Sequence, residues 1–470
     1  MRRNYIKLFC IILTSIIVLG CNDYDITPVE YDENAKEKIS EEPIAPNINP
    51  EWNLVPIRNI GQNADGVFVY KDNKYNQLFE RTTGWNGGDG VLTTELPGGN
   101  IFWSFNDSFY GRVNPENRSR YSSNFPRNNI MIQKNGGETP ADLVWLADYI
   151  STDPDSERYF QARTHIRHPW ASLSEEQIQN GEIDSDYLYW AGDATVINKE
   201  GTNKLQVLWG GVDKDMNRVS TCLATYNLSG SMPSDYYSGL NIPDYVPHTG
   251  DYMNLETVDH DFMPGNSTYG STILEGVEDD NHIYLYTSTS QGPNPSDKLD
   301  QKVVLVARTQ TRDLSSKWEY YIRNLSGQFG WQDDYPTADE MMRSNILLNN
   351  ASCEMPWIFH DGGTYYLVAQ AGFSALNMKI YRSDTPYGPF RDEKVLFSLP
   401  KTIDKIGYQY WNALYMVNLH TGLSREGELV FSTNTDAPDF FDNFNAPGSA
   451  DYYRPYFYRV YNWKSVYRDE

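Results

Sequence analysis

The sequence predicts an all-β fold and, within that class, a five-bladed β-propeller. From about residue 51 onward, short β-prone runs are punctuated by Gly, Asn and Asp, and long helical periodicities are few. A unit of two such runs joined by a turn also recurs five times, tens of residues apart. Five hairpins with other strands between them are typical of the inner strands of five blades. A β-sandwich or a two-domain chain is the alternative.

The five hairpins share a run of small and apolar residues, a turn, and a second apolar or aromatic run. Their paired runs are residues 90–96 with 101–105, 194–198 with 205–209, 271–274 with 283–286, 356–359 with 365–369, and 413–418 with 428–431. The remaining chain length allows four strands and long loops in each blade. Residues 110–186 and 232–265 are loop-rich, and in a propeller such insertions border the binding face.

The N-terminus predicts export as a lipoprotein. Residues 1–20 contain a basic start, an apolar run at residues 8–19 and then Gly20, directly before Cys21. The apolar run is too short for a comfortable membrane span, which favours a cleaved signal peptide over an uncleaved anchor. Residues 18–21 resemble the lipobox that is cleaved just before a lipidated cysteine, so we expect Cys21 to carry a lipid anchor. Residues 21–50 are polar and acidic and predict a flexible tether, which leaves residues 51–470 for the propeller.

Composition narrows the class of partner. The formal charge is −24, and it becomes −27 when Arg2, Arg3 and Lys7 leave with the signal peptide. Nucleic acid is therefore not expected as a partner, because phosphate binding needs concentrated Lys and Arg. The 35 Tyr and 12 Trp suit a protein that handles glycans, although both residues also favour strands. We expect a monomer whose partner is a polysaccharide or oligosaccharide.

The cysteines and histidines allow at most one disulfide and indicate no zinc site. With Cys10 in the signal peptide and Cys21 lipidated, only Cys222 and Cys353 remain, as one disulfide or as two buried thiols. The seven His show no metal-type spacing, so we expect no zinc site and no cofactor. The acidic runs at residues 259–261 and 279–280 could bind calcium but lack the spacing of a known calcium loop.

The sharpest functional prediction concerns two aspartates of the first hairpin. Asp89 and Asp107 are equidistant from Gly98 at the turn, so an unbulged antiparallel hairpin places them directly opposite each other. Opposite residues have Cβ atoms about 5 Å apart. Two carboxylates that close repel, which raises one pKa and provides an acid and a nucleophile. Retaining glycosidases use carboxyl groups about 5 Å apart. The alternatives are that both receive loop N–H groups or that a bulge spoils the register.

Other candidates stand at the mouths of later hairpins. Asp193 and Glu354 lead the second and fourth hairpins and would point at the central axis of a propeller, where catalysis or a loop hydrogen bond is equally expected. Tryptophans that flank these positions could stack on sugar rings, although each could equally belong to the core. They are Trp85, Trp190, Trp357 and Trp411.

Two motifs carry a resemblance to known families. Residues 84–111, with Gly-Gly-Asp-Gly and Phe-Asn-Asp-Ser-Phe, resemble the opening blade of the uncharacterised bacterial domains DUF4185 and DUF5005, and residues 426–434 and 453–457 resemble their end. Asn106 and Ser108 depart mildly from the usual Phe-Gly-Asp-Thr-Phe. Such domains resemble the five-bladed furanosidases of glycoside hydrolase families 43 and 32. One branch is the family 183 endo-D-arabinanases.

The resemblance implies a second catalytic scheme. Residues 354–359 with 363–367 are similar to the family 43 acid motif, and residues 383–390 to a blade segment of that family. By that similarity Asp89 is the base, Asp193 the pKa-tuning acid and Glu354 the general acid of an inverting enzyme. The hairpin geometry instead favours Asp89 with Asp107 in a retaining enzyme.

Together with the paired carboxylates and the predicted anchor, the resemblance implies a surface-tethered glycoside hydrolase that cleaves furanoside linkages in an arabinose-containing polysaccharide. Acid-rich residues behind Cys21 resemble the surface-export signal of Bacteroidetes lipoproteins, which implies a site on the outer membrane facing outward. A noncatalytic glycan-binding lipoprotein of a polysaccharide-utilisation system is the main alternative. A propeller that serves as a protein-interaction platform is a third.

Overall fold

A computed structural model describes residues 54–56, 66–229, 252–263, 269–274, 281–400 and 413–467. The predicted signal peptide, Cys21, the predicted tether and Trp411 lie outside the described residues. The described residues belong to one unit, Glu51–Glu470.

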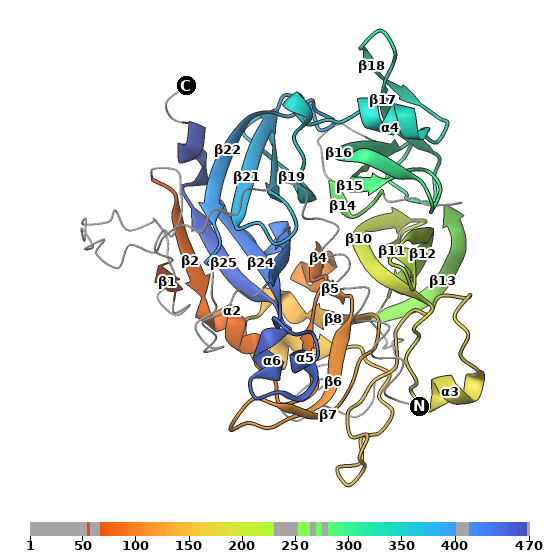
Figure 1. Cartoon of the computed structure of the whole chain (residues 1–470), viewed down its shortest axis with the longest axis vertical. Helices are drawn as coiled ribbons and strands as arrows, with labels where there is room; N and C mark the ends of the chain where they lie inside the picture. Colours follow the sequence, from red (N-terminus) through yellow and green to blue (C-terminus); the bar gives the residue numbers. More distant parts are fainter. Residues whose placement is uncertain are drawn as a thin grey trace. The chain divides into compact units, whose positions relative to one another are not determined.

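The fold is all-β, as predicted, and its strands form six sheets (Figure 1). The first two sheets contain β3 (Thr83–Gly88), β6 (Ser108–Val113) and β7 (Arg120–Asn124), and β4 (Leu92–Glu95), β5 (Ile101–Phe105), β8 (Asn129–Gln133) and β9 (Leu143–Trp145). The third contains β10 (Tyr187–Lys199), β11 (Thr202–Asp213), β12 (Arg218–Leu228) and β13 (Met253–Met263).

Three further sheets follow along the chain. They contain β14 (Thr272–Leu274), β15 (Tyr284–Gln291), β16 (Lys298–Thr309), β17 (Trp318–Arg323) and β18 (Phe329–Gln332); β19 (Glu354–Asp361), β20 (Thr364–Gln370), β21 (Asn377–Ser383) and β22 (Arg391–Ser398); and, in spatial order, β1 (Leu54–Pro56), β2 (Phe68–Asp72), β25 (Tyr456–Tyr461), β24 (Glu428–Asp436) and β23 (Ala413–Leu419). The last sheet joins the N-terminal strands to the C-terminal ones.

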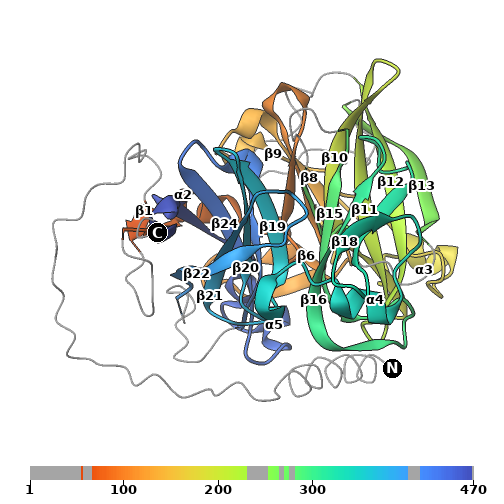
Figure 2. The same cartoon turned by 90° about the horizontal axis from the view of Figure 1, so that it is seen from above.

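The helices are short. Figures 1 and 2 show two of them, α3 and α4, on the outside of the sheets. The helices are α2 (Asn73–Leu78), α3 (Glu175–Gln179), α4 (Ala338–Arg343), α5 (Asp442–Asn445) and α6 (Ser449–Tyr452), with 3₁₀ turns at Pro97–Gly99, Lys134–Gly136, Pro140–Asp142, Leu348–Asn350, Thr421–Leu423 and Trp463–Tyr467. Within the described ranges, no helix combines the length and the apolar character needed to cross a membrane.

All five predicted hairpins are present as antiparallel neighbours: β4 with β5, β10 with β11, β14 with β15, β19 with β20, and β23 with β24. The first hairpin turns at Gly98 and Gly99, whose φ values of 80° and 79° only glycine adopts readily. The first strands of the hairpins contact one another in chain order, from β4 to β10, β14, β19 and β23. The turn after β23 then contacts β4.

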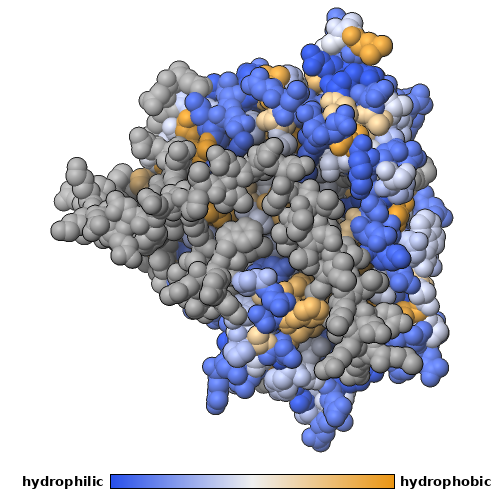
Figure 3. All heavy atoms as spheres, viewed as in Figure 1, coloured by the Kyte–Doolittle hydropathy of each residue, from blue (hydrophilic) through white to orange (hydrophobic). Residues whose placement is uncertain are grey.

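The core consists of apolar residues between neighbouring sheets. Its largest cluster includes Trp209, Phe359 and Phe431 from three different sheets. A second cluster under the first hairpin is strongly aromatic, and Trp85 stacks on Trp145 with ring centroids 4.8 Å apart. The surface visible in Figure 3 is mostly hydrophilic outside the grey atoms, which accords with the acidic composition.

Cys222 and Cys353 are both buried free thiols. Of the two alternatives that the sequence leaves open, the structure has the unpaired one. Burial raises the pKa of the Cys222 thiol to about 12, so this side chain is an apolar core group rather than a nucleophile.

Candidate active site

The first hairpin divides into two sheets at the two predicted aspartates. Leu92 pairs with Ser104 on one side of the break, and Gly88 pairs with Ser108 on the other. The register is therefore the same on both sides, and Asp89 and Asp107 lie at the break between the paired strands, where the Asn106 N–H also donates to the Asp89 carbonyl at 2.8 Å. The Asp89 N–H donates to the Asp107 carbonyl at 3.2 Å. The nearest register shift lies farther out, between Trp85 and Gly87.

Gly90 makes the break possible. Its φ of 66° turns the chain directly after Asp89. A Cβ atom at this position would lie 2.3 Å from the Asn106 side chain, so no larger residue fits without displacement. Asn106 in turn accepts from the Ala191 N–H at 2.6 Å and joins the break to β10.

Asp89 is a buried carboxyl with two hydroxyl donors on one oxygen. Tyr415 donates to Oδ2 at 2.8 Å and Tyr453 donates to the same atom at 2.7 Å. The other oxygen, Oδ1, is buried and has no hydrogen-bond partner within the described residues.

Burial raises the pKa of Asp89 to about 7, and the neighbouring charge of Asp107 adds to the rise, while the two tyrosine hydroxyls oppose it. Near neutral pH this carboxyl therefore changes between its acid and its base form. That is the range a general acid or base needs.

Asp107 differs from Asp89 because it forms an ion pair with an arginine. Arg127 Nη1 lies 3.2 Å from Asp107 Oδ1, and both side chains are buried. Burial raises the pKa of Asp107, and the positive charge and hydrogen bond of Arg127 act in the opposite direction. The pKa of Asp107 is raised overall, as is that of Asp89, but the ion pair with Arg127 favours the ionised form of Asp107. No cation is among the groups that act most strongly on the pKa of Asp89.

A third carboxyl, Asp436 on β24, also acts on Asp89. Its charge raises the pKa of Asp89, and burial raises its own pKa to about 6. The Asn443 amide and the Ala437 N–H oppose that rise. The charges of Asp107 and Asp436 thus both act on the pKa of Asp89.

The sequence did not single out Tyr415, Arg127 or Asp436, and it marked Tyr453 only as part of residues 453–457, which resemble the end of the family domains, without a role at the site. Tyr453 lies 364 positions from Asp89 along the chain, and Tyr415 lies 326 positions away. With 35 tyrosines in the chain, no local pattern distinguishes these two.

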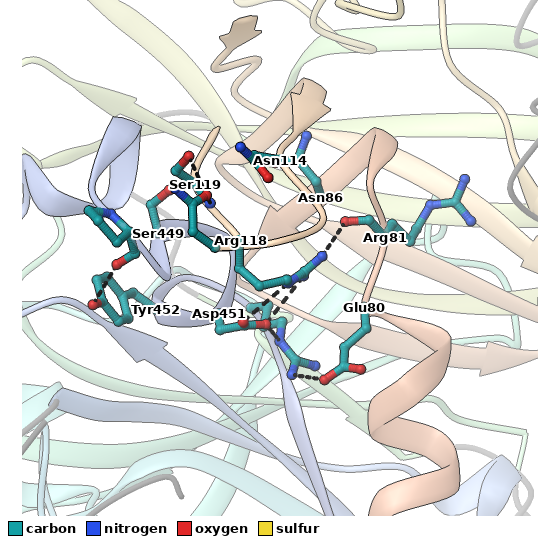
Figure 4. A network of polar contacts seen from close by, with 12 residues as sticks. Glu80, Arg81, Asn86, Asn114, Arg118, Ser119, Ser449, Asp451 and Tyr452 are labelled. Carbon is teal, nitrogen blue, oxygen red and sulfur yellow. Dashed lines mark hydrogen bonds and ion pairs between the residues drawn. The ribbon is translucent and has the colours of Figure 1, made fainter. Parts of the chain in front are cut away.

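A polar network under the site holds the segment that carries Tyr453. Figure 4 shows the Arg118 guanidinium between the Arg81 carbonyl and the Asp451 carboxylate on α6. Asp451 also accepts from Arg454 Nε at 3.1 Å. These bonds link α6 to the β6–β7 turn on one side and to the C-terminal chain on the other.

Arg120 fixes Tyr453 from the other side. This fully buried guanidinium donates to the Tyr453 carbonyl at 3.2 Å, to the Asn86 side chain at 2.7 Å and to the Ser449 carbonyl at 2.6 Å. Burial holds its pKa well below the usual range. The donors of Arg120 thus hold the backbone of the segment that carries Tyr453, whose hydroxyl bonds Asp89.

Asp193 and Glu354 have different surroundings from the aspartate pair. Asp193 is buried, and its two oxygens accept from the Ala194 and Ile273 N–H groups, which joins β10 to β14. Glu354 is half-buried and forms an ion pair with Lys302. Neither is among the groups that act most strongly on the pKa of Asp89. Their role in catalysis stays a prediction.

The predicted tryptophans are mostly inside the protein. Trp85 is fully buried and Trp357 is 4% exposed, so neither presents a ring face to solvent. Trp190 is half-buried next to Asp107, and its indole lowers the pKa of that carboxyl. Among the described residues, no group of three His, Cys, Asp or Glu side chains is placed to hold a metal ion.

Fold and site define an all-β protein with a buried, coupled aspartate pair at a break in its first hairpin. The family model described as "Domain of unknown function (DUF5005)" matches residues 72–463, so the chain belongs to this family. It is 50% identical to a "putative hydrolase" from Bacteroides ovatus ATCC 8483, with a TM-score of 0.81, over 92% of this chain and 99% of that one.

Two enzymes of known structure are more distant. An exo-beta-1,3-galactanase from Phanerochaete chrysosporium is 10% identical, with a TM-score of 0.38, over 79% of this chain and 60% of that one. A GH43_1 enzyme from Xanthomonas citri is 12% identical, with a TM-score of 0.39, over 82% and 92%. At these values neither enzyme bears on the activity of this chain. No curated protein matches the sequence.

Proposed function

We propose that the chain is a glycoside hydrolase that cleaves furanoside linkages, with arabinofuranosides of a polysaccharide as the first substrates to test. The observation that carries the proposal is the difference between two facing carboxyls. Asp89 has a pKa of about 7 and an oxygen without a partner, whereas Asp107 is paired with Arg127. Such a pair provides one acid and one carboxylate at the same pH.

In this mechanism Asp89 Oδ1 holds the proton and donates it to the glycosidic oxygen as the bond to the anomeric carbon breaks. Tyr415 and Tyr453 keep the carboxyl oriented through Oδ2. The Asp107 carboxylate attacks the anomeric carbon, and water then releases the sugar with Asp89 acting as base. In the alternative inverting scheme, Asp89 is the base that activates water and Glu354 donates the proton to the glycosidic oxygen.

The direct test is hydrolysis of a panel of arabinan, arabinoxylan, arabinogalactan and galactan, with products separated by chromatography. We expect Asp89→Asn and Asp107→Asn each to lower kcat at least a hundredfold, the scale of one lost acid or base. Asp215→Asn, at an exposed turn, is the matched control and should keep full activity. Full activity of Asp89→Asn would refute the proposal.

The stereochemistry of the first product distinguishes the two schemes. NMR of the newly formed anomeric centre should show retention if Asp107 is the nucleophile. Inversion would favour the scheme with Asp193 and Glu354, and alanine variants of those residues would then be inactive.

We also propose that the described strands form a five-bladed propeller, supported by the contacts of the five hairpins in chain order. We propose further that the chain is a lipoprotein of the outer membrane, on its outer surface. Cys21→Ser should then move the protein from the detergent phase to the aqueous phase. Protease treatment of intact cells should digest the wild-type protein. A wild-type protein that survives the treatment would lie on the inner side of the outer membrane.

A further inference from the structure

We propose that Phe373 is a sugar-binding platform beside Asp89 and that it determines the affinity for polymeric substrate. The inference rests on the proposed function, since the sugar is the one whose linkage Asp89 and Asp107 cleave. Phe373 follows β20, far along the chain from the first hairpin. It is one of five large hydrophobic residues that are exposed within the described part of the chain.

Phe373 is connected to Asp89 through a single residue, Tyr415. Its ring centroid is 5.5 Å from that of Tyr415, at an interplanar angle of 36°. The Tyr415 hydroxyl donates to Asp89 Oδ2 at 2.8 Å. Tyr415 is buried, whereas 57% of Phe373 is exposed. The exposed ring therefore covers the tyrosine that orients Asp89.

Hydrogen bonds fix the loop that carries Phe373. Its turn closes with a bond from the Ala375 N–H to the Gly372 carbonyl at 2.9 Å. The buried amide of Gln370 donates to the Ala375 carbonyl and to the Leu414 carbonyl, both at 2.7 Å. Leu414 precedes Tyr415, so one side chain ties the loop to the strand that carries the tyrosine.

The backbone also departs from its preferred region at this point. Ser374 has a φ of 60°, a conformation that is unfavourable for a non-glycine residue. More than half of the neighbouring Phe373 side chain is also left in water. A fixed loop with a residue at positive φ thus presents an exposed ring on the tyrosine that bonds Asp89, which suits a ligand contact at this position.

The ligand class follows from the chemistry of the surface. A flat apolar ring stacks on the C–H face of a sugar, while Asp89 and Asp107 face its anomeric carbon and glycosidic oxygen. The ring forms no hydrogen bond, so it contributes affinity without fixing the pattern of hydroxyls. We therefore assign it to a sugar unit next to the cleaved bond.

The test uses the full mature protein with Phe373→Ala, Phe373→Trp and the control Leu325→Ala. Leu325 is 93% exposed on the turn between β17 and β18, in a different sheet. On the best substrate of the panel, Phe373→Ala should raise KM about tenfold and leave kcat within about twofold, since a stacking contact of about 1.4 kcal/mol is tenfold in affinity. Phe373→Trp should restore the wild-type KM, and Leu325→Ala should leave both constants unchanged.

A binding measurement separates this inference from the proposed function. Each Phe373 variant is combined with Asp89→Asn and run through native gels that contain each polysaccharide of the panel. The platform is supported if Asp89→Asn is retarded and the double variant Asp89→Asn with Phe373→Ala is not, even if the wild type cleaves nothing. Equal retardation of both proteins, or an unchanged KM, would overturn it. The absence of both retardation and cleavage with every polysaccharide would overturn both proposals.

Discussion

At the scale of single residues, the environment of each carboxyl decides its chemistry. Asp89 and Asp107 occupy opposite positions in one hairpin, yet only Asp107 has an arginine. Asp89 has two tyrosine hydroxyls instead, which lower its pKa but do not offset burial. The same side chain can therefore be an acid at one position and a carboxylate at the other.

The raised pKa of Asp89 makes the protein less stable as pH increases. The folded carboxyl keeps its proton up to about pH 7, whereas the unfolded one loses it near pH 4. Stability from this group is complete below pH 4 and is lost as pH rises to 7. Asp89→Asn should therefore raise the free energy of unfolding at pH 8 by about 2 to 4 kcal/mol.

The amide oxygen of that variant can still accept from both tyrosines. Denaturant unfolding at pH 8 and pH 5 measures the effect, and the gain should be smaller at pH 5. A gain of equal size at both pH values would mean that the charge of Asp89 is not its cause.

Tyr453→Phe and Tyr415→Phe test the hydroxyl pair. Each hydroxyl favours the charged form of Asp89, so its removal raises the pKa of Asp89 further. If protonated Asp89 is the general acid, the alkaline limb of the kcat/KM profile should move to higher pH in each variant. The kcat should also fall about tenfold, because the carboxyl loses part of its orientation. A limb that does not move would assign that ionisation to another group.

At the scale of elements, the site depends on a close approach between three segments. Gly87 on β3 faces both Arg120 and the segment that carries Tyr453. A Cβ atom at Gly87 would lie 2.0 Å from Arg120 Nη2 and 2.2 Å from the Tyr453 carbonyl oxygen. The absence of a side chain at this position lets Arg120 hold that carbonyl.

Gly87→Ala should therefore destabilise the fold by about 2 kcal/mol and lower kcat through displacement of Tyr453. Gly330→Ala is the matched control, because Gly330 also lies in a strand and a Cβ atom there would have no neighbour within 4 Å. Its effect should stay within about 0.5 kcal/mol. Thermal unfolding and hydrolysis rates measure both variants, and equal effects would contradict the proposed close packing.

At the scale of the whole molecule, the N-terminal strands complete a sheet made by the C-terminus. β2 pairs with β25, and Arg459 on β25 bonds Asp72 and Glu428, each at 2.5 Å. All three side chains are buried. Burial raises the pKa of Asp72, and Arg459 opposes the rise. The ion group thus connects the two ends of the described chain.

Arg459→Met should destabilise the protein by about 3 to 5 kcal/mol, because it leaves two buried carboxylates without a cation. Lys317→Met removes an exposed ion pair with Asp333 and should cost less than about 1 kcal/mol. Denaturant unfolding of the two variants provides the comparison. A similar loss for both would mean that the buried group does not secure the sheet.

The all-β class, the five hairpins and the proximity of Asp89 to Asp107 in the first hairpin could be predicted from the sequence. These features depend on local alternation and on the length of one turn, and both are visible over less than twenty residues. The roles of Tyr415, Tyr453, Arg127 and Phe373 could not. Each of these acts through a neighbour that only folding brings near, and nothing adjacent in the chain distinguishes them from other residues of the same type.

Only the tertiary structure decided what the two aspartates are. Strand register places them opposite each other, but a pKa depends on burial and on charges from every direction. Arg127, Asp436 and two distant tyrosines supply those effects, while the core covers Trp85 and Trp357. Short-range pattern therefore sets the positions of the acids, and long-range packing sets their chemistry.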